Sequence, residues 1–421
     1  MKILMVCEDI PALQLGGLGK HVVTLSNALL AKGHEVALLG RTEPDYQSCS
    51  TEVGFRGRFI PALDMTHSGW KEPALGFFNP WKRPFFARRI AKAIRRHARG
   101  FDIVHYHGHL PMVGRYVPSS VPFVQTRHDQ GSECIIHLRF RNGDVCRELD
   151  PRACASCIHQ APGPLRTALS AHAVSRYRRE TADAFAKHPV VFVSDFLQKA
   201  FARVLPEANL TKAHVVHNFV NETALHGASQ TNDLNSPAGA VWRIVIAGRI
   251  DEAKGFGAFL DAALPRIDDN VMLEIIGDGP ARAAVEKRHR DARVVFRGYQ
   301  PYAVVLAATK AADVTIVPSV CQEACGTTIL EAMRLGKPCF ALARGGTPEL
   351  AVYGAPSQLR LFPDMNSLVD GLIEVLRAGK SSIVTGGVST SLTHGCSADV
   401  AHAAERLLAL YRDIVTERPR A

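Results

Sequence analysis

The sequence predicts two α/β domains, each built on a parallel sheet in the doubly wound manner. Short apolar runs of strand length alternate with helical patterns along the chain. The same alternation restarts after a polar stretch just past the middle of the chain. A length of 421 residues is also too great for one compact core, which makes two domains the default expectation.

The first domain opens with a strand at Lys2 to Cys7, followed by the glycine-rich loop Gly16-Gly17-Leu18-Gly19. A helix from about residue 20 to 32 and a strand at Glu35 to Leu39 complete a strand–loop–helix–strand unit. The loop lacks the GxGxxG spacing of a dinucleotide site. Further strands are predicted at Asp102 to His105, Phe123 to Thr126, Val190 to Val193 and His214 to His217.

The domain boundaries follow from composition. We predict a first domain over 1–225, a linker over 226–240 that is rich in small and polar residues, and a second domain over 241–421. We expect the final helix, about 398–416, to pack back on the first domain. Strands of the second domain are predicted at Arg243 to Ala247, Val271 to Ile276, Val294 to Phe296, Val314 to Val317 and Cys339 to Ala341.

The overall charge favours anionic partners. Lys and Arg outnumber Asp and Glu by 50 to 40, a net charge of +10. No apolar run approaches the roughly 20 residues of a membrane span, and the short apolar run at the N-terminus is typical of a first strand rather than a signal peptide. Ten cysteines without a secretion signal favour reduced thiols and the cytoplasm.

Residues 79–100 hold eight Lys or Arg and no acidic residue. Phe86, Ile90 and Ile94 recur at helical spacing, so the stretch predicts an amphipathic helix. One interpretation is a crossover helix that packs on the sheet with a solvated basic face. The other is contact of that face with the inner face of an anionic membrane, and the two are compatible.

Residues Pro318 to Leu350 predict a strand, a tight turn at Cys325-Gly326-Thr327, and a helix ended by Gly336. The start of a helix after such a turn presents unpaired N–H groups to an anion. Glu323 before the turn and Glu331 within the helix are better suited to accept hydrogen bonds from hydroxyls. The pattern therefore predicts a ligand that carries both phosphate and sugar.

Two further loops at predicted strand ends add positive charge and tight turns. Gly248-Arg249 and then Lys254-Gly255 follow the first strand of the second domain, where a guanidinium and an ammonium suit a diphosphate. Surface charge is the alternative interpretation. Gly277 to Pro280 follows another strand as a tight turn, and the alternative interpretation is a turn without a binding role.

In their order and spacing these motifs resemble glycosyltransferase family 4, the retaining GT-B enzymes that use nucleotide-activated sugars. The resemblance covers most of the chain. It rests on Gly16-Gly17, Gly248-Arg249 with Lys254-Gly255, Ile276 to Pro280, Phe296 to Tyr299, Glu323 with Glu331, and Gly345 to Glu349. It implies a GT-B fold, with two Rossmann-like domains facing across a cleft.

The resemblance also implies residue roles. Glu331 would accept hydrogen bonds from the nucleotide ribose, and Glu323 would contact the transferred sugar near its reacting face. Arg249 and Lys254 would neutralise the departing diphosphate. The remaining donor-binding candidates are the amides of Cys325, Gly326 and Thr327 at the distal phosphate, the loops at Gly277 and Tyr299 around the base, and Gly16 and Gly17 at the donor phosphate or acceptor.

Histidines at strand ends supply further candidates. In the family, a histidine at the place of His128 reaches the donor sugar, so His128 joins Glu323, Arg249 and Lys254 as a predicted catalytic residue. His107 is a candidate for acceptor contact. We do not favour a metal site in His105-Tyr106-His107-Gly108-His109, because we expect its alternate side chains to lie on opposite faces and no carboxylate joins them.

Cys134, Cys146, Cys154 and Cys157 follow one another as C-x11-C-x7-C-x2-C. Four thiolates with one CxxC pair suit tetrahedral zinc, but the spacing of the first two is loose. A structural zinc site and four reduced cysteines without metal both remain open.

Taken together, these features predict a hexosyltransferase that moves a sugar from a UDP- or GDP-type donor to an acceptor hydroxyl. The acceptor would be a glycan, a lipid-linked molecule or a small molecule, as in polysaccharide or lipopolysaccharide synthesis. No Asp-x-Asp pair follows a predicted strand, so we expect catalysis without a metal or other cofactor. The alternatives are a sugar-nucleotide epimerase of GT-B-like architecture and a non-catalytic scaffold; no nucleic-acid-binding motif is present.

Overall fold

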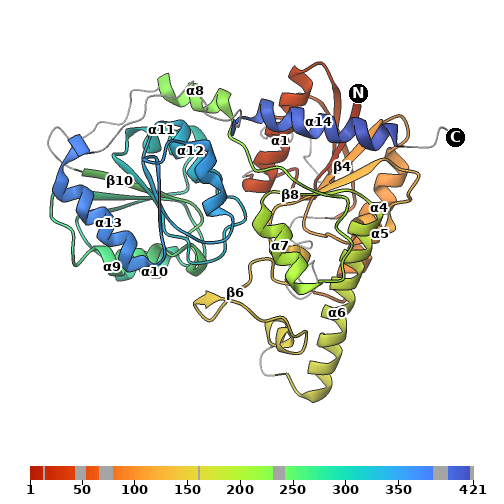
Figure 1. The fold of residues 1–421 in the computed structure, drawn as a ribbon, viewed down its shortest axis with the longest axis horizontal. Coiled ribbons are helices and arrows are strands. Elements are labelled where there is room, and N and C mark those ends of the chain that lie inside the picture. The colour runs from red at the N-terminus through yellow and green to blue at the C-terminus, as the bar shows by residue number, and fades with distance from the viewer. Residues whose placement is uncertain are drawn as a thin grey trace. The chain divides into compact units, whose positions relative to one another are not determined.

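The computed structural model describes residues 1–12, 15–42, 54–65, 79–159, 162–230, 242–382 and 397–417. The chain divides into two compact units. The first contains Met1–Arg139, Arg147–His217 and Val400–Ala421, and the second contains Phe140–Cys146 and Asn218–Asp399. Each unit is built on one parallel sheet covered by helices (Figure 1).

The sheet of the first unit has seven strands in the order β3-β2-β1-β4-β5-β8-β9, and every neighbouring pair is parallel. The strands are β1 (Lys2–Val6), β2 (Glu35–Arg41), β3 (Arg58–Leu63), β4 (Ile103–His107), β5 (Phe123–Arg127), β8 (Val190–Phe192) and β9 (Ala213–Val215). The helices are α1 (Gly17–Ala31), α4 (Arg83–His97), α5 (Val113–Tyr116), α6 (Pro164–Lys187), α7 (Asp195–Val204) and α14 (Val400–Thr416), with short 3₁₀ turns η1 (Gln130–Ser132) and η2 (Ala153–Cys157).

The basic helix α4 follows the crossover interpretation. Phe86, Ile90 and Ile94 are buried in the core of the first unit, together with Leu4 and Val104 of the sheet. Apolar side chains at spacings of four residues line one face of a helix, so burial of that face leaves Arg88, Lys92, Arg95 and Arg96 exposed on the other. Arg83, at the start of the helix, is the exception and is buried.

The last helix, α14, also belongs to the first unit. Lys32 Nζ, at the end of α1, lies 2.8 Å from Glu405 Oε1 of α14. Arg406 Nη2 donates a hydrogen bond to Val215 O at 2.8 Å. Buried Leu407 and Tyr411 anchor the same helix.

The sheet of the second unit has six parallel strands in the order β12-β11-β10-β13-β14-β15. They are β10 (Trp242–Ala247), β11 (Val271–Ile276), β12 (Val294–Gly298), β13 (Val314–Val317), β14 (Cys339–Leu342) and β15 (Leu359–Phe362). The helices are α8 (Glu222–Gln230), α9 (Phe256–Ala263), α10 (Arg282–Arg288), α11 (Tyr302–Ala311), α12 (Thr327–Arg334) and α13 (Met365–Ala378), with 3₁₀ turns η3 (Glu252–Lys254), η4 (Thr347–Tyr353) and η5 (Lys380–Ser382).

Both sheets share a topological feature that predicts where a ligand binds. The chain moves outward from β1 in one direction and then restarts on its other side with β4, and β10 and β13 repeat this arrangement. In open parallel sheets, ligands bind beyond the carboxyl ends of the strands at such a switch point. The loops that follow β1, β4 and β5 in the first unit, and β10 and β13 in the second, are therefore the expected ligand-binding loops.

Four strands are absent from the sequence prediction. Strands β3 and β15 were not predicted, and both are sheet-edge strands that are only partly buried. Pro61 within β3 also weakens its strand pattern, although proline is tolerated at an edge. The antiparallel hairpin of β6 (Phe140–Arg141) and β7 (Asp144–Val145) was likewise not predicted.

The predicted linker, 226–240, is described only as far as Gln230, and that part lies in α8 of the second unit. The boundary between the units falls after His217 instead. Within the described ranges, no helix combines the length and apolar character that a membrane crossing requires.

Candidate active site

In the second unit, Lys254 and Glu323 meet at the carboxyl ends of β10 and β13. Lys254 ends η3, and its Nζ lies 2.6 Å from Glu323 Oε1. The side chain of Lys254 is 30% exposed and that of Glu323 14%. Two loops that are about 70 residues apart in the sequence are thus joined by one close ion pair.

The backbone around Lys254 explains its position. The carboxylate of Asp251 caps η3 by accepting a hydrogen bond from Lys254 N at 3.0 Å. The next residue, Gly255, has φ +71°, and a Cβ there would lie 2.1 Å from Pro318 O. Only glycine permits this approach between the two loops.

Glu323 is held by a third loop, which follows β14. Gly346 N donates a hydrogen bond to Glu323 O at 2.7 Å. A Cβ on Gly345, whose φ is +59°, would lie 2.2 Å from the same oxygen. The Gly-Gly-Thr-Pro-Glu motif therefore has a physical role, which is to fix the backbone that carries Glu323.

Burial and charge act against each other in this pair. Burial alone would raise the pKa of Glu323, but the ammonium of Lys254 outweighs it, so the pKa is lowered. Burial would likewise lower the pKa of Lys254, and the charge of Glu323 raises it instead. Both groups are therefore charged at neutral pH, and an anionic ligand would meet an ammonium already held in place.

Helix α12 starts directly after this loop with N-cap Gly326. Glycine has no side chain to accept a hydrogen bond from the amides of the first turn, so these amides remain suited to an external anion. Asn218 supports the turn by donating from Nδ2 to Cys325 O at 3.0 Å. The structure thus brings Cys325, Gly326 and Thr327 to a helix N-terminus, as the sequence predicted.

Glu331 lies one turn further along α12 and is half-buried. Tyr302 Oη donates a hydrogen bond to Glu331 Oε1 at 2.6 Å. Burial and then the charge of Glu331 raise the pKa of Tyr302, so its hydroxyl stays protonated and remains a donor. Tyr302 was not predicted from the sequence, since a tyrosine at the start of an apolar helix carries no functional signal.

The other predicted donor residues lie on neighbouring loops. Arg249 is exposed, and its Nε pairs with Asp251 Oδ2 at 2.7 Å rather than with Glu323. Gly248 N donates to Ile276 O at 2.9 Å, and Gly277 N donates to Gly298 O at 2.8 Å. Tyr299, which follows Gly298, is 46% exposed.

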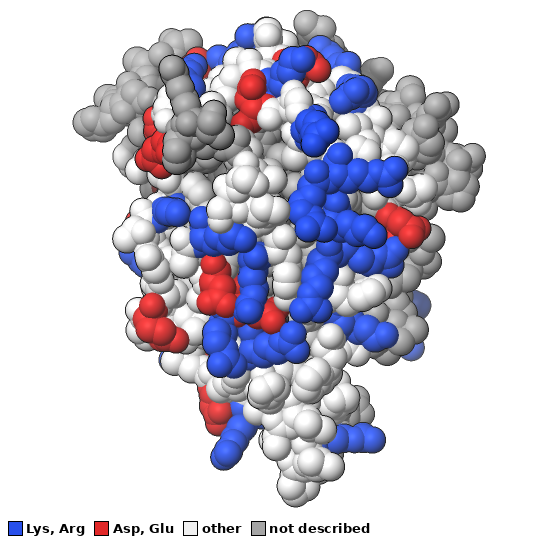
Figure 2. Space-filling view, turned by 90° about the vertical axis from the view of Figure 1, so that its right-hand side faces the viewer, with Lys and Arg blue, Asp and Glu red and all other residues white. Residues whose placement is uncertain are grey.

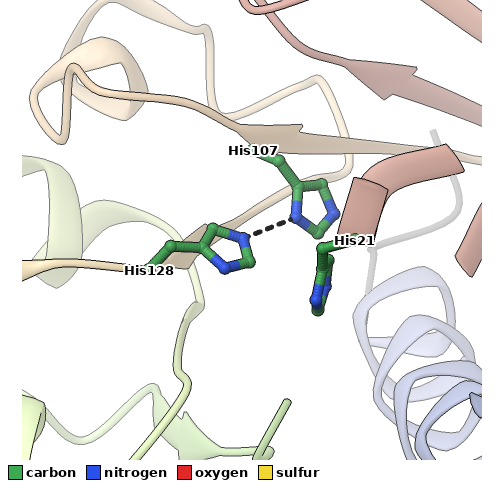
Figure 3. Close-up of side chains that lie close together, drawn as sticks. All are labelled: His21, His107 and His128. Carbon is green, nitrogen blue, oxygen red and sulfur yellow. Dashed lines mark hydrogen bonds between the residues drawn. The ribbon is translucent and has the colours of Figure 1, made fainter. Parts of the chain in front are cut away.

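In the first unit, three histidines from separate elements gather at the switch point (Figure 3). His21 comes from α1, His107 ends β4, and His128 directly follows β5. His107 Nδ1 lies 3.0 Å from His128 Nε2, and the ring centroids of His21 and His128 are 4.5 Å apart. Gly16 and Gly17 lie at the start of α1, one helical turn before His21.

Burial dominates the electrostatics of this cluster. It lowers the pKa of His21 to about 3 and lowers the pKa values of His107 and His128 well below the ordinary range. Three uncharged imidazoles therefore lie together at neutral pH. The sequence identified His107 and His128, but a single histidine on a helix gave no reason to select His21.

The expectation that alternate histidines point to opposite faces was wrong. Residues two apart in a strand share a face, and the rings of His105 and His107 have centroids 3.9 Å apart. Both ring nitrogens of His105 already form hydrogen bonds. Nε2 lies 2.7 Å from Thr126 Oγ1, and Nδ1 lies 2.5 Å from Tyr411 Oη of α14.

Carboxylates also join His109, which the sequence did not predict. His109 Nε2 lies 3.1 Å from Asp9 Oδ2, and His109 Nδ1 lies 3.7 Å from Asp129 Oδ2. Burial would lower the pKa of His109, but these carboxylates raise it to about 10. His137 Nδ1 approaches Asp129 Oδ2 at 3.1 Å from the other side. Asp9 follows the first strand, and that position was the available signal.

The four cysteines are divided between the two units, since Cys146 falls in the second and the others in the first. Cys154 and Cys157 pack against the core of the first unit, and Arg178 Nη2 lies 3.5 Å from Cys154 Sγ. Among the described residues, two groups of His, Cys, Asp and Glu are close enough to share an ion, and neither includes a cysteine. The zinc interpretation of the cysteines stays a prediction.

Comparison with known proteins defines the class. Residues 15–224 match the sequence family described as "Glycosyltransferase Family 4", and residues 242–378 match "Glycosyl transferases group 1". A glycogen synthase of Mycobacterium tuberculosis is 26% identical over 84% of this chain and 81% of its own length. A phosphatidyl-myo-inositol mannosyltransferase of Mycobacterium leprae is 25% identical over 90% and 88%.

Solved structures agree on the fold. HepE of Anabaena in complex with UDP superposes with a TM-score of 0.65 at 15% identity, covering 98% of this chain and all of HepE. The catalytic domain of starch synthase IV from Arabidopsis thaliana, bound to ADP and acarbose, superposes with a TM-score of 0.61 at 15% identity over 99% of each chain. The protein is therefore a glycosyltransferase with the GT-B fold. It belongs to glycosyltransferase family 4, as its motifs indicated.

Proposed function

We propose that this protein is a retaining hexosyltransferase that moves a sugar from a UDP- or GDP-sugar to an acceptor hydroxyl. The acceptor would be a glycan, a lipid-linked intermediate or a small molecule in polysaccharide, lipopolysaccharide or other glycoconjugate synthesis. The observation that carries the proposal is the Lys254–Glu323 pair of 2.6 Å beside the N-terminus of α12. A cation and helix amides suit a diphosphate, and a fixed carboxylate suits the hydroxyls of a sugar.

The residues have separate roles in this proposal. Lys254, Arg249 and the amides of Gly326 and Thr327 stabilise the charge that develops on the departing diphosphate. Such prearranged donors are worth about 3 kcal/mol each in comparable sites. Glu331, oriented by Tyr302, accepts hydrogen bonds from the ribose. Glu323 and His128 contact the transferred sugar.

Retention is proposed to occur by attack on the same face of the sugar. The bond between the anomeric carbon and the diphosphate oxygen breaks as the acceptor oxygen bonds to that carbon, and the acceptor proton passes to the departing phosphate oxygen. Glu323 forms an ion pair with Lys254, and this makes its carboxylate a poor nucleophile. Proton NMR of the product, compared with the donor, would report the anomeric configuration, and inversion would contradict the proposal.

The donor class is tested by calorimetry with UDP, GDP and ADP. HepE was solved with UDP and with UDP-glucose, and starch synthase IV with ADP. We expect binding of UDP or GDP, weakened by Glu331→Gln because the ribose loses its acceptor. Equal affinity for the variant would contradict the role of Glu331, and binding of none of the three would contradict the proposed function.

We also propose that no metal is needed for catalysis, because Lys254 and the start of α12 supply the positive charge that a metal would otherwise provide. Enzyme treated with EDTA should keep its full turnover, and restoration of activity only by added Mg²⁺ or Mn²⁺ would contradict this.

A sugar-nucleotide epimerase remains the alternative for the same nucleotide site. An epimerase changes the donor when no acceptor is present, whereas a transferase leaves the sugar of the donor intact or slowly hydrolyses it. Incubation with donor alone, followed by separation of the sugar nucleotides, distinguishes the two.

The proposed location is the cytoplasm at the inner face of the membrane. Lys82, Arg88, Lys92, Arg95 and Arg96 are exposed on and beside α4, next to the exposed aromatic residues Trp81 and Phe85. Figure 2 shows Lys and Arg gathered on this side of the molecule with few acidic groups among them. Basic and aromatic side chains together suit an anionic lipid surface.

A further inference from the structure

The histidine cluster in the first unit has the composition of a transition-metal site. We propose that His21, His107 and His128 bind one divalent transition-metal ion, with Zn²⁺, Co²⁺, Ni²⁺ and Cu²⁺ as the fitting class. One nitrogen from each ring lies within 4.8 Å of the nitrogens offered by the other two. The three come from helix α1, the end of strand β4 and the loop after strand β5, all in one unit, so the fold itself brings them together.

The distances fit an ion with little adjustment. Two ligand nitrogens on a tetrahedral zinc lie about 3.3–3.4 Å apart, given Zn–N distances of about 2.0–2.1 Å. His107 Nδ1 and His128 Nε2 are already 3.0 Å apart, which is slightly closer than that. His21 is half-buried, and its ligand nitrogen lies within 4.8 Å of the other two.

The tautomer of His107 can change to accommodate a metal at Nδ1. Its side chain is completely buried, and its Nε2 has no hydrogen-bond partner among the described residues. One proton is shared between His107 Nδ1 and His128 Nε2 at present. If that proton moves to the other nitrogen of the ring that carries it, the lone pairs of His107 Nδ1 and His128 Nε2 both become available to a metal. Neither imidazole changes its charge in this step.

The donor set selects the kind of metal. Imidazole suits zinc, cobalt, nickel and copper, whereas Mg²⁺ and Ca²⁺ require oxygen ligands. The nearby group of His109, Asp129 and His137 differs, because His109 is held as a cation between Asp9 and Asp129. A metal there would have to displace a proton and break both ion pairs. Three protein ligands would leave one position of a tetrahedral ion open.

A metal in this position would inhibit rather than support transfer. It would take His128 from the sugar contact that we assign to it, and this consequence rests on the proposed function. Metal binding itself does not, so the two can fail separately.

The binding experiment uses full-length protein freed of metal by chelation. Co²⁺ is titrated while its visible absorption is recorded, and bound metal per chain is counted after dialysis. His21→Ala and His107→Gln are the test variants. His137→Gln is the matched control, because it removes a histidine from the neighbouring group, and His226→Ala controls for an exposed histidine on α8.

We expect wild-type protein and both controls to bind one Co²⁺ with an imidazole-type spectrum that lacks intense thiolate charge transfer. Each test variant should lose that ion or bind it at least about tenfold more weakly, since even indirect supports of metal sites are worth 10–100-fold. Circular dichroism must show that the variants are folded, and His21→Ala decides the matter if His107→Gln is not. Unchanged binding by His21→Ala, or a loss confined to His137→Gln, would overturn the proposal.

The functional consequence is measured as donor turnover with increasing Zn²⁺. Wild-type activity should fall as the site fills and return with EDTA, while His21→Ala should resist the same Zn²⁺ concentration. Occupied metal with undiminished turnover would overturn the inhibitory role. Metal binding by a protein that transfers no sugar would overturn the proposed function and leave the metal site standing.

Discussion

Lys254 and Glu323 are joined by an ion pair of 2.6 Å that links the loop after β10 with the loop after β13. Each group favours the charged form of the other, and this attraction opposes the effect of burial on both pKa values. This pairing fixes an ammonium and a carboxylate side by side at the switch point of the sheet. It is the feature on which the donor half of the proposed site depends.

Glu323→Gln should lower kcat by about 100-fold or more, with less than about a threefold change in UDP or GDP affinity, because the contact matters when charge develops on the sugar. Steady-state kinetics and calorimetry give the two values. Glu286→Gln, an exposed carboxylate on α10, is the control. Glu323→Gln alone leaves the ammonium of Lys254 without its partner, and the double variant Lys254→Gln/Glu323→Gln removes that charge. If the double variant recovered both stability and turnover, the effect of Glu323→Gln would be structural, and the catalytic role would be contradicted.

Tyr302→Phe should weaken nucleotide binding by about 3- to 10-fold, the net worth of one ordinary intramolecular hydrogen bond. The carboxylate of Glu331 would lose the donor that orients it at 2.6 Å. Tyr116→Phe removes a similar hydroxyl-to-carboxylate bond in the first unit, to Glu180 at 2.9 Å, and should leave affinity unchanged. Equal effects of the two variants on calorimetric affinity would argue against the assignment of Glu331 to the ribose.

Glu274→Ala should destabilise the second unit by about 3–5 kcal/mol, because it leaves a buried guanidinium without its partner. Arg243 Nη2 lies 2.7 Å from Glu274 Oε2, and both side chains are less than 10% exposed. Urea unfolding followed by fluorescence measures the change. Glu374→Ala breaks an exposed pair with Arg360 and should change stability by less than about 1 kcal/mol.

Acid should destabilise the first unit through buried neutral histidines such as His188. Burial lowers its pKa to about 4, so between pH 6.5 and 4 the unfolded chain takes up a proton that the folded chain does not. The contribution of His188 to the free energy of unfolding is therefore fully present above pH 6.5. Below that pH it falls by up to about 1.4 kcal/mol per pH unit. His188→Gln should flatten this slope in denaturant unfolding measured at several pH values, and an unchanged slope would contradict the assignment.

Arg95→Glu/Arg96→Glu should weaken binding to vesicles rich in anionic lipid by at least about tenfold, since each basic residue near such a surface contributes about 1 kcal/mol. Both arginines are exposed on α4. Lys287→Glu/Arg290→Glu makes the same charge change on exposed residues of the second unit. Cosedimentation should separate the two variants, and equal losses would show that net charge alone, rather than the α4 face, attracts the protein.

Most of the fold could be predicted because buried parallel strands appear in the sequence as continuous runs of apolar residues. The strands at the centres of both sheets, such as β1, β4, β10 and β13, were all expected close to their observed bounds. The edge strands β3 and β15 were missed, since an edge is only partly buried and its sequence need not be apolar.

The candidate donor-binding residues were also accessible from the sequence, because helix starts, glycine turns and charged residues near strand ends are local patterns. Lys254, Glu323 and the turn at Gly326 could each be found in this way. Their distances could not, since pairing between Lys254 and Glu323 depends on how two loops pack, with Gly255 and Gly345 permitting the close approaches. Arg249 illustrates the limit, because a local partner, Asp251, holds it in this structure.

The sequence by itself determined the family, the two parallel sheets and the candidate residues for phosphate and sugar binding, because each is encoded in short segments. Tertiary structure alone decided which distant groups meet. His21 joins His107 and His128, Asp9 and Asp129 make His109 a cation, and Tyr302 reaches Glu331. These contacts join residues on different elements, and the burial that sets their charge exists only once the sheet has formed.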